Sequence, residues 1–354
     1  MSIVQSKQQL CDWLNHFQHP LLIEGWAEVN SIVKMLKDGS ISIQLPFYSK
    51  DLQTSLSNWI ENEDIDSSKI RVSVHVASME TVVKSEVSNV KNIIAVTSAK
   101  GGVGKSTTAV NLALALRAQG AEVGLLDADI YGPSVPMMLG KEDERPDVRD
   151  NQFMIPIESF GIYTNSIGYL VDKAEAAIWR GPMASKALGQ LLNETDWPEL
   201  DYLVIDMPPG TGDVQLTLSQ NIAVTGSIIV TTPQDLALAD VRKGLAMFEK
   251  VDVPVIGIVE NMSYHVCSHC GEKEHIFGIN GAEKVAQEFG QNLLAQVPLH
   301  ISMREDIDAG KPTVVARPEG EHTQIYLQMA EKIASTLFWS GRVQPEHIPL
   351  TNLS

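Results

Sequence analysis

A glycine-rich segment between an apolar run and a helical pattern constrains the fold of this chain more than any other feature. Residues 98–107 read SAKGGVGKST, with the β-branched run Ile93–Thr97 before them and the helix-forming stretch Lys105–Gln119 after them. A strand, a glycine loop ending in Lys-Ser and a helix form the arrangement of a phosphate-binding loop, or P-loop. A glycine turn carrying two solvated lysines is the simpler alternative, and the flanking strand and helix disfavour it.

The residue types in this loop match the needs of a bound phosphate chain. Glycines let backbone N–H groups turn toward phosphate oxygens, and the helix N-terminus adds partial positive charge. We expect Lys105 to neutralise the β- and γ-phosphates and the Ser106 hydroxyl to bind Mg²⁺. The loop departs from the standard pattern, because Ala99 replaces its first glycine and Lys100 follows. The loop residues expected to contact nucleotide are Gly101, Gly102, Val103, Gly104, Lys105, Ser106 and Thr107.

Beyond the loop, short β-branched runs alternate with helical segments. This alternation predicts an α/β fold, a P-loop NTPase with a mostly parallel sheet flanked by helices. The expected strands are Ile93–Thr97, Val123–Leu126, Leu203–Ile205, Ser227–Thr231, Val255–Val259 and Leu293–Val297. The expected helices are Lys105–Gln119, Met183–Leu192, Val214–Ala223, Leu236–Phe248, Ala282–Phe289 and His322–Thr336.

The first part of the chain differs from the rest in its pattern of expected strands and helices. Ile41–Leu45 and Val72–Val76 alternate apolar and polar residues as half-buried strands do, and Leu52–Ile60 between them has a helical pattern. We therefore expect a small α+β domain ahead of the P-loop domain. The expected division is residues 1–80 for the N-terminal domain, 81–92 for a linker, 93–340 for the P-loop domain and 341–354 for a tail.

Charge and composition exclude several functional classes. The 354 residues include 27 Lys and Arg against 44 Asp and Glu, a formal net charge of -17 that disfavours non-specific binding to nucleic acid or anionic membranes. No window of about 18 uninterrupted apolar residues exists, and residues 1–20 lack the pattern of a signal peptide. We therefore expect a soluble, cytoplasmic protein that binds neither nucleic acid nor membrane.

Acidic residues follow two further strands at the expected carboxyl edge of the sheet. Asp127 and Asp129 come after the second strand and Asp206 ends another, which is where ligands bind in such sheets. We expect Asp206 to hold Mg²⁺ through water, the Gly210 N–H to face the γ-phosphate, and Asp129 to orient the attacking water. The simpler alternative is that Asp127 or Asp129, taken alone, caps a loop, and the P-loop upstream disfavours this alternative for the two together.

The three cysteines are too few for a disulfide framework, but two of them form a CxxC pair. Cys267 and Cys270 follow the strand Val255–Val259, and Cys11 has the character of a small buried residue. A tetrahedral metal needs four donors, so two subunits related by a two-fold axis would supply the missing pair. The alternatives are a zinc site using the same thiolates, with or without His265, His269 or His275, and a dithiol redox pair.

Several motifs together resemble one family. The lysine-first loop is similar to the deviant Walker A motif of septum-site and plasmid-partition ATPases (the MinD/ParA-like group) and of the nitrogenase iron protein. Over residues 91–340 the chain resembles the Mrp/ApbC-type iron-sulfur cluster carriers. The resemblance rests on residues 127–134 (DADIYGPS), 179–183 (WRGPM), 206–213 (DMPPGTGD) and 260–263 (ENMS).

The resemblance implies both an assembly and roles for individual residues. It implies a homodimer that closes over two ATP molecules, with Lys100 reaching the phosphates held by the partner. It implies that Asn261 reads the adenine, which suits the paired donor and acceptor of an amide. It also implies that Cys267 and Cys270 bind a transferable [4Fe-4S] cluster bridging the two subunits.

The function expected from this resemblance is a slow ATPase that carries a labile [4Fe-4S] cluster to apo-proteins, with cluster scaffold or donor proteins as further partners. The alternative is a MinD/ParA-like spatial organiser, which would need a terminal amphipathic helix or a basic face. A kinase or amide ligase on the same loop would leave the cysteines without a role. Nitrogenase-type electron transfer is disfavoured, because the cluster cysteines of that protein lie far apart in its sequence.

Overall fold

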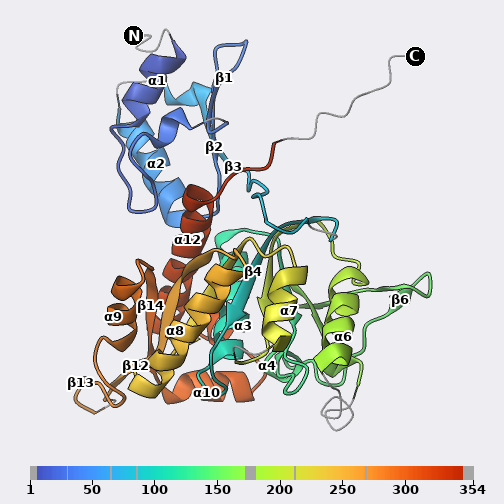
Figure 1. The fold of residues 1–354 in the computed structure, drawn as a ribbon. Helices are drawn as coiled ribbons and strands as arrows, with labels where there is room; N and C mark the ends of the chain where they lie inside the picture. The colour runs from blue at the N-terminus through green and yellow to red at the C-terminus, as the bar shows by residue number, and fades with distance from the viewer. Residues whose placement is uncertain are drawn as a thin grey trace.

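The computed structural model describes the chain at residues 6–29, 31–63, 66–84, 87–171, 181–210, 213–267 and 269–345. Residues 6–76 form a small module of two helices and a three-stranded sheet, drawn at the top of Figure 1. In this sheet the central strand pairs antiparallel with the first and parallel with the third. The elements are α1 (Lys7–Leu14), β1 (Val33–Met35), β2 (Ile41–Leu45), α2 (Lys50–Asn62) and β3 (Ile70–Val74).

The main sheet has nine strands, and it confirms the expected α/β fold. The strand order is β13-β12-β11-β4-β10-β5-β9-β8, with β14 paired to β12. All pairs are parallel except β12 with β13 and β8 with β9. The strands are β4 (Val90–Thr97), β5 (Val123–Asp127), β8 (Ile157–Ser159), β9 (Ile162–Ser166), β10 (Leu200–Asp206), β11 (Gly226–Thr231), β12 (Val255–Val266), β13 (Lys273–Glu274) and β14 (Leu293–Leu299).

Helices cover both faces of this sheet (Figure 1). Alternate residues of β4 belong to opposite cores, with Ile94 and Val96 packed in one and Ile93 and Ala95 in the other. The first core includes α3 (Lys105–Gln119) and α12 (Glu321–Ser340). The second includes α6 (Gly181–Asn193), α7 (Asp213–Asn221), α8 (Asp235–Lys250) and α9 (Gly281–Glu288).

All six strands expected in the main sheet are present, and the structure adds elements that the sequence pattern did not predict. The most consequential is β9, which pairs with β5 and brings Ser166 opposite Asp127. The strand β12 also runs seven residues further than expected, to Val266. The other additions are α4 (Val135–Met138), β6 (Val148–Arg149), β7 (Phe153–Met154), β8, β13, α10 (Ile301–Asp308) and α11 (Thr313–Ala316).

The helix α12 joins the N-terminal module to the main sheet, and one apolar core runs through both. Phe47 of the module packs against Phe338 of α12, with ring centroids 6.5 Å apart. The Ser49 hydroxyl caps α2 and also donates to the Glu331 carboxylate of α12 at 2.8 Å. Beyond α12, backbone hydrogen bonds join residues 342 and 344 to residues 80 and 78. No helix among the described residues is long and apolar enough to cross a membrane.

Candidate nucleotide and metal site

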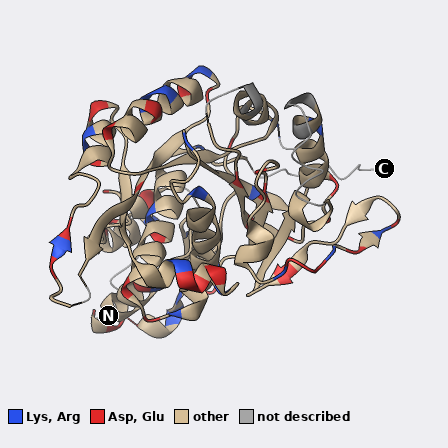
Figure 2. Cartoon of the chain, turned by 90° about the horizontal axis from the view of Figure 1, so that it is seen from below, with Lys and Arg blue, Asp and Glu red and all other residues tan. Residues whose placement is uncertain are grey.

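Functional side chains converge on the carboxyl edge of the main sheet, because parallel strands all end there. The P-loop follows β4, Asp127 and Asp206 end β5 and β10, and the cysteine pair follows β12. In Figure 1 this edge lies at the bottom, near α10 and β13, and the N-terminal module lies at the opposite end. Figure 2 views the molecule from this edge and shows Lys and Arg interspersed with Asp and Glu.

The P-loop backbone forms an open cradle in front of α3. Gly102 and Gly104 have φ values of 80° and 85°, which favour glycine. A Cβ at Gly101 or Gly102 would meet nothing within 4 Å, whereas one at Gly104 would collide with the Asn261 amide. The loop therefore presents open space where phosphates would lie and rests against Asn261 on another side. This geometry fits a bound nucleotide.

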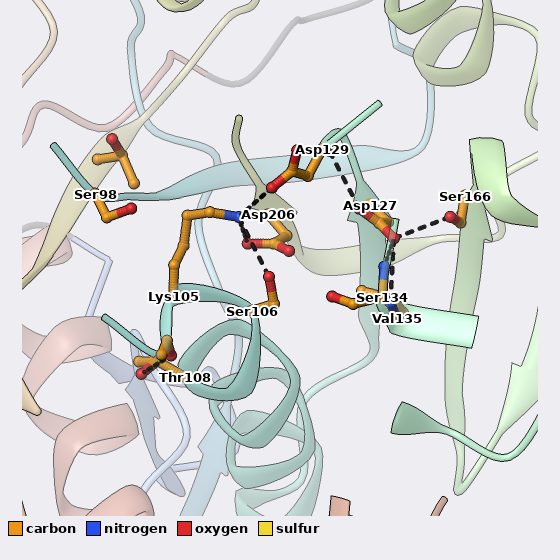
Figure 3. Close-up of polar contacts among 12 residues, drawn as sticks. Ser98, Lys105, Ser106, Thr108, Asp127, Asp129, Ser134, Val135, Ser166 and Asp206 are labelled. Carbon is orange, nitrogen blue, oxygen red and sulfur yellow. Dashed lines mark hydrogen bonds and ion pairs between the residues drawn. The ribbon is translucent and has the colours of Figure 1, made fainter. Parts of the chain in front are cut away.

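Lys105 lies at the centre of a buried charge cluster (Figure 3). Its Nζ is 2.6 Å from Asp206 Oδ1, 3.5 Å from Asp129 Oδ2 and 3.3 Å from the Ser106 hydroxyl. Burial would lower the pKa of Lys105, but the charges of Asp206 and Asp129 outweigh burial and raise it above its usual value. Lys105 is therefore a fixed ammonium at the start of α3.

Asp206 retains an unused oxygen inside this cluster. Its side chain is fully buried, and Oδ2 has no hydrogen-bond partner. Burial raises the pKa of Asp206, and the nearby Lys105 opposes that rise. A buried carboxylate oxygen without a partner beside the Ser106 hydroxyl fits the hard oxygen donors that Mg²⁺ prefers. The residues present thus fit a magnesium ion held by Ser106 and Asp206.

The two aspartates after β5 occupy different environments. Asp127 is fully buried and accepts four hydrogen bonds, from the backbone N–H groups of Asp129, Ser134 and Val135 and from the Ser166 hydroxyl. Burial and the charge of Asp206 raise the pKa of Asp127 to about 7. With its oxygens committed to the loop, Asp127 shapes that loop, and Asp129 is the carboxylate directed at Lys105 (Figure 3).

Lys100 lies apart from the Lys105 cluster. Its Nζ is 3.2 Å from Asp240 Oδ2 and 3.5 Å from the Leu236 carbonyl, both on α8. Hydrogen bonds from Lys243 and Lys100 lower the pKa of Asp240, which keeps this carboxylate ionised. Within one chain, Lys100, the first lysine of the loop, is therefore bound to its own α8.

Two residues expected to meet nucleotide make contacts within the protein. The Asn261 Nδ2 donates to the Val103 carbonyl at 2.8 Å, so this amide braces the P-loop. The Gly210 N–H donates to the Ser98 carbonyl at 2.8 Å. The roles predicted for Asn261 at adenine and for Gly210 at the γ-phosphate remain predictions. The Thr107 carbonyl accepts from Asn111 inside α3.

The cysteine pair lies on a hairpin formed by β12 and β13. His265 and Val266 pair with Glu274 and Lys273 across this hairpin. The Cys267 N–H donates to the Glu272 carbonyl, and the Gly271 N–H donates to the Cys267 carbonyl. Both thiols are free, and Cys270 is exposed.

The electrostatics of the hairpin favour a thiolate at Cys267. Hydrogen bonds from the backbone N–H groups of Cys270 and His269 lower the pKa of the Cys267 thiol. Thiolates are the metal-binding form of cysteine. Among the described residues no group of three or more His, Cys, Asp or Glu side chains is placed to hold a metal, and His265 and His275 point Nδ1 at backbone carbonyls. The described part of one chain therefore offers two thiol donors.

Comparison with known proteins identifies the family to which the chain belongs. The family model described as ParA, NUBPL iron-transfer P-loop NTPase, matches residues 89–334. The chain belongs to this family. The resemblance inferred from the motifs is thus confirmed.

Two curated relatives cover nearly the whole chain. The iron-sulfur cluster carrier protein of Haemophilus influenzae is 54% identical over 97% of this chain and 95% of its own length. The protein of the same name from Escherichia coli K12 is 55% identical over 95% of this chain and 93% of its own. A solved nucleotide-binding protein from Archaeoglobus fulgidus, in complex with ADP, is 36% identical with a TM-score of 0.59, covering 67% of this chain and 93% of that one.

Sequence reasoning missed the contacts of three residues that organise the site, although Glu260 lies in one of the quoted motifs. Ser166 binds Asp127, Asp240 binds Lys100, and Glu260 lies buried beside Asn261. The alternation in Ile162–Ser166 could have revealed the strand that carries Ser166, whereas no local signal pairs Asp240 with Lys100. Residues 179–180 and 211–212 of the quoted motifs lie outside the described residues.

Proposed function

We propose that this protein is a nucleotide-dependent carrier that assembles a [4Fe-4S] cluster between two copies of itself and transfers it to apo-proteins. The observation that carries the proposal is the position of Cys267 and Cys270 at the same sheet edge as the P-loop, with two thiols in one chain and no further ligands among its described residues. A four-coordinate cluster then needs a second copy.

The charge cluster supports ATP as the nucleotide and hydrolysis as the reaction. Lys105 has three oxygen partners within 3.5 Å, and a phosphate oxygen can replace one of them. Ser106 and Asp206 would hold Mg²⁺, which supplies charge neutralisation on the phosphates. Asp129 is the carboxylate left to orient water, since the oxygens of Asp127 are occupied. Turnover is slow if ATP serves as a switch between assemblies.

The surface around the site supports a homodimer closed through this edge. Large apolar side chains are exposed on several segments that follow the sheet's strands, and their burial would favour the association of two copies. Leu236 at the start of α8 is 72% exposed. For Lys100 to reach a partner's phosphates, it must leave Asp240. The other exposed apolar residues at this edge are Tyr131, Leu170, Met183, Ile276, Ile279 and Ile301.

Anaerobic reconstitution with iron and sulfide tests the proposal. The expected product is a dimer with about four irons and a broad absorbance at about 400 nm. Cys267→Ala should lose this iron, whereas the matched control Cys11→Ala should retain it, because Cys11 is buried in the N-terminal module and donates to the Ala27 carbonyl. A full iron load in Cys267→Ala, or a wild-type protein that loads no cluster, would contradict the proposal.

A further inference from the structure

A buried carboxylate joins three elements beside the site. Glu260 on β12 is fully buried. Its Oε1 accepts from the Ser263 hydroxyl at 2.6 Å and from Gln296 Nε2 of β14 at 3.0 Å. Its Oε2 accepts from the Ala282 N–H at 2.7 Å, at the start of α9. One side chain therefore contacts a second position of β12, at Ser263, and ties β12 to β14 and to α9.

The backbone of β12 is irregular at this point. Met262 has a φ of 54°, in the left-handed region that a non-glycine side chain seldom adopts. The register between β12 and β14 shifts between Asn261 and His265. The hydrogen bond from Ser263 to Glu260 spans this irregularity, so it holds the backbone in a conformation that is strained for a non-glycine residue.

The irregularity lies between two functional segments of the same strand. On one side, Asn261 donates to the Val103 carbonyl of the P-loop and contacts Gly104 closely. On the other side, the strand continues to Val266, and Cys267 follows. The six residue-to-residue steps from Asn261 to Cys267 span at most about 20 Å. His275, on the return side of the cysteine hairpin, approaches the Ser263 carbonyl with Nδ1 at 3.3 Å.

We propose that Glu260 is a positioning residue that couples the P-loop to the cysteine hairpin. When the P-loop closes on phosphates, the Val103 carbonyl moves with it and carries Asn261. Rotation at Met262 could absorb that movement before it reaches Cys267. Glu260 prevents such rotation by holding Ser263, Gln296 and α9 together, so the movement passes to the hairpin.

This inference deepens the proposed function and rests on it, because it concerns how nucleotide acts on the cluster-binding hairpin. Coupling between sites requires a physical link whose state both sites bias. Here that link is the strand β12. Its backbone could rotate at Met262, and the hydrogen bonds of Glu260 restrain that rotation. Conversely, a ligand that fixes the hairpin changes nucleotide affinity by the same factor.

Hydrogen exchange on the metal-free, full-length protein tests the coupling without a cluster. In the wild type we expect Mg-ADP to slow exchange in the P-loop and, by about tenfold, in residues 263–275. In Glu260→Gln, we expect the P-loop to respond as before and the hairpin response to fall below about twofold. The matched control is Glu331→Gln, which changes a buried carboxylate of α12 and should leave the hairpin response intact.

Two results would overturn the inference: a hairpin that ignores Mg-ADP in the wild type, or one that responds fully in Glu260→Gln. If Glu260→Gln does not fold, Ser263→Ala decides, because it removes only the hydrogen bond across the irregularity. Failure of iron loading in the reconstitution experiment would overturn the carrier function and leave this measurement unaffected. The two failures are therefore distinguishable.

Discussion

At the scale of single residues, the site depends on how buried charges are partnered. Lys105 holds its charge because Asp206 and Asp129 face it, whereas Asp127 is surrounded by donors and lies near a second buried carboxylate. Buried charges are tolerated only when they are paired or hydrogen-bonded. Removing one member therefore changes both nucleotide chemistry and stability, and the two effects can be measured separately.

Lys105→Ala should reduce ATP hydrolysis by about 100-fold or more, because it removes the cation that we propose faces the transferred phosphate. A phosphate-release assay at saturating ATP measures the loss. Lys141→Ala is a suitable control, since Lys141 pairs with Glu144 on the surface. Undiminished hydrolysis in Lys105→Ala would remove the role that we assign to this lysine.

The raised pKa of Asp127 predicts that the free energy of unfolding falls as the pH rises toward neutrality. Its pKa is about 7 in the folded chain and about 3.9 when unfolded, so the folded state binds this proton more tightly. The stability from this proton is present below about pH 4 and is lost as pH rises to about 7. Asp127→Asn, which stays neutral, should lack this loss.

Urea denaturation of the wild type and Asp127→Asn at about pH 5.5 and about pH 8 measures this effect. Relative to the variant, the wild type should lose about 1–3 kcal/mol between the two conditions. Asp143→Asn, at an exposed position, serves as the control. A constant difference between wild type and Asp127→Asn across this range would show that Asp127 is ionised throughout.

At the scale of elements, α12 and β12 each connect parts that are distant in sequence. The helix α12 packs on the main sheet with one end of its apolar surface and holds Phe47 and Ser49 of the N-terminal module with the other. The strand β12 carries both the brace on the P-loop and the approach to the cysteines. Neither element belongs to one site or module alone.

The shared core predicts that the two parts of the chain unfold together. Phe47→Ala should lower the free energy of unfolding by about 3–5 kcal/mol, because Phe47 is fully buried against α12. Calorimetry should show one transition shifted as a whole in the variant. Val82→Ala, at a position 68% exposed, should leave the transition in place. Two separate transitions, with only one moved by Phe47→Ala, would contradict a shared core.

At the scale of the whole molecule, the N-terminal module and the candidate site lie at opposite ends of the main sheet (Figure 1). A homodimer closed through the carboxyl edge would leave both N-terminal modules at its outer ends. A protein that binds this module would then not compete with the dimer interface.

The net charge of -17 predicts weak interaction with polyanions. At physiological salt the protein should not co-sediment with DNA or with anionic liposomes, with or without ATP. A DNA-binding protein rich in Lys and Arg is a positive control for the assay. ATP-dependent co-sedimentation would revive the alternative of a spatial organiser.

The sequence alone determined the six expected strands of the main sheet and the chemistry of the loop, because both depend on local patterns. The β-branched runs, the helical periodicity and the glycine-lysine spacing of residues 98–107 act over a few residues, and they located the six strands and the P-loop helix. The position of the cysteine pair after a strand was equally readable.

Only the tertiary structure decided which hydrogen-bond and ion-pair partners the side chains of the site have. Ser166 reaches Asp127 because β9 pairs with β5, and Asp240 meets Lys100 because α8 packs beside the P-loop. Glu260 binds three elements at once. Such contacts join residues far apart in the chain, so they depend on strand order, register and helix packing, which follow from the burial of the whole core and not from local preference.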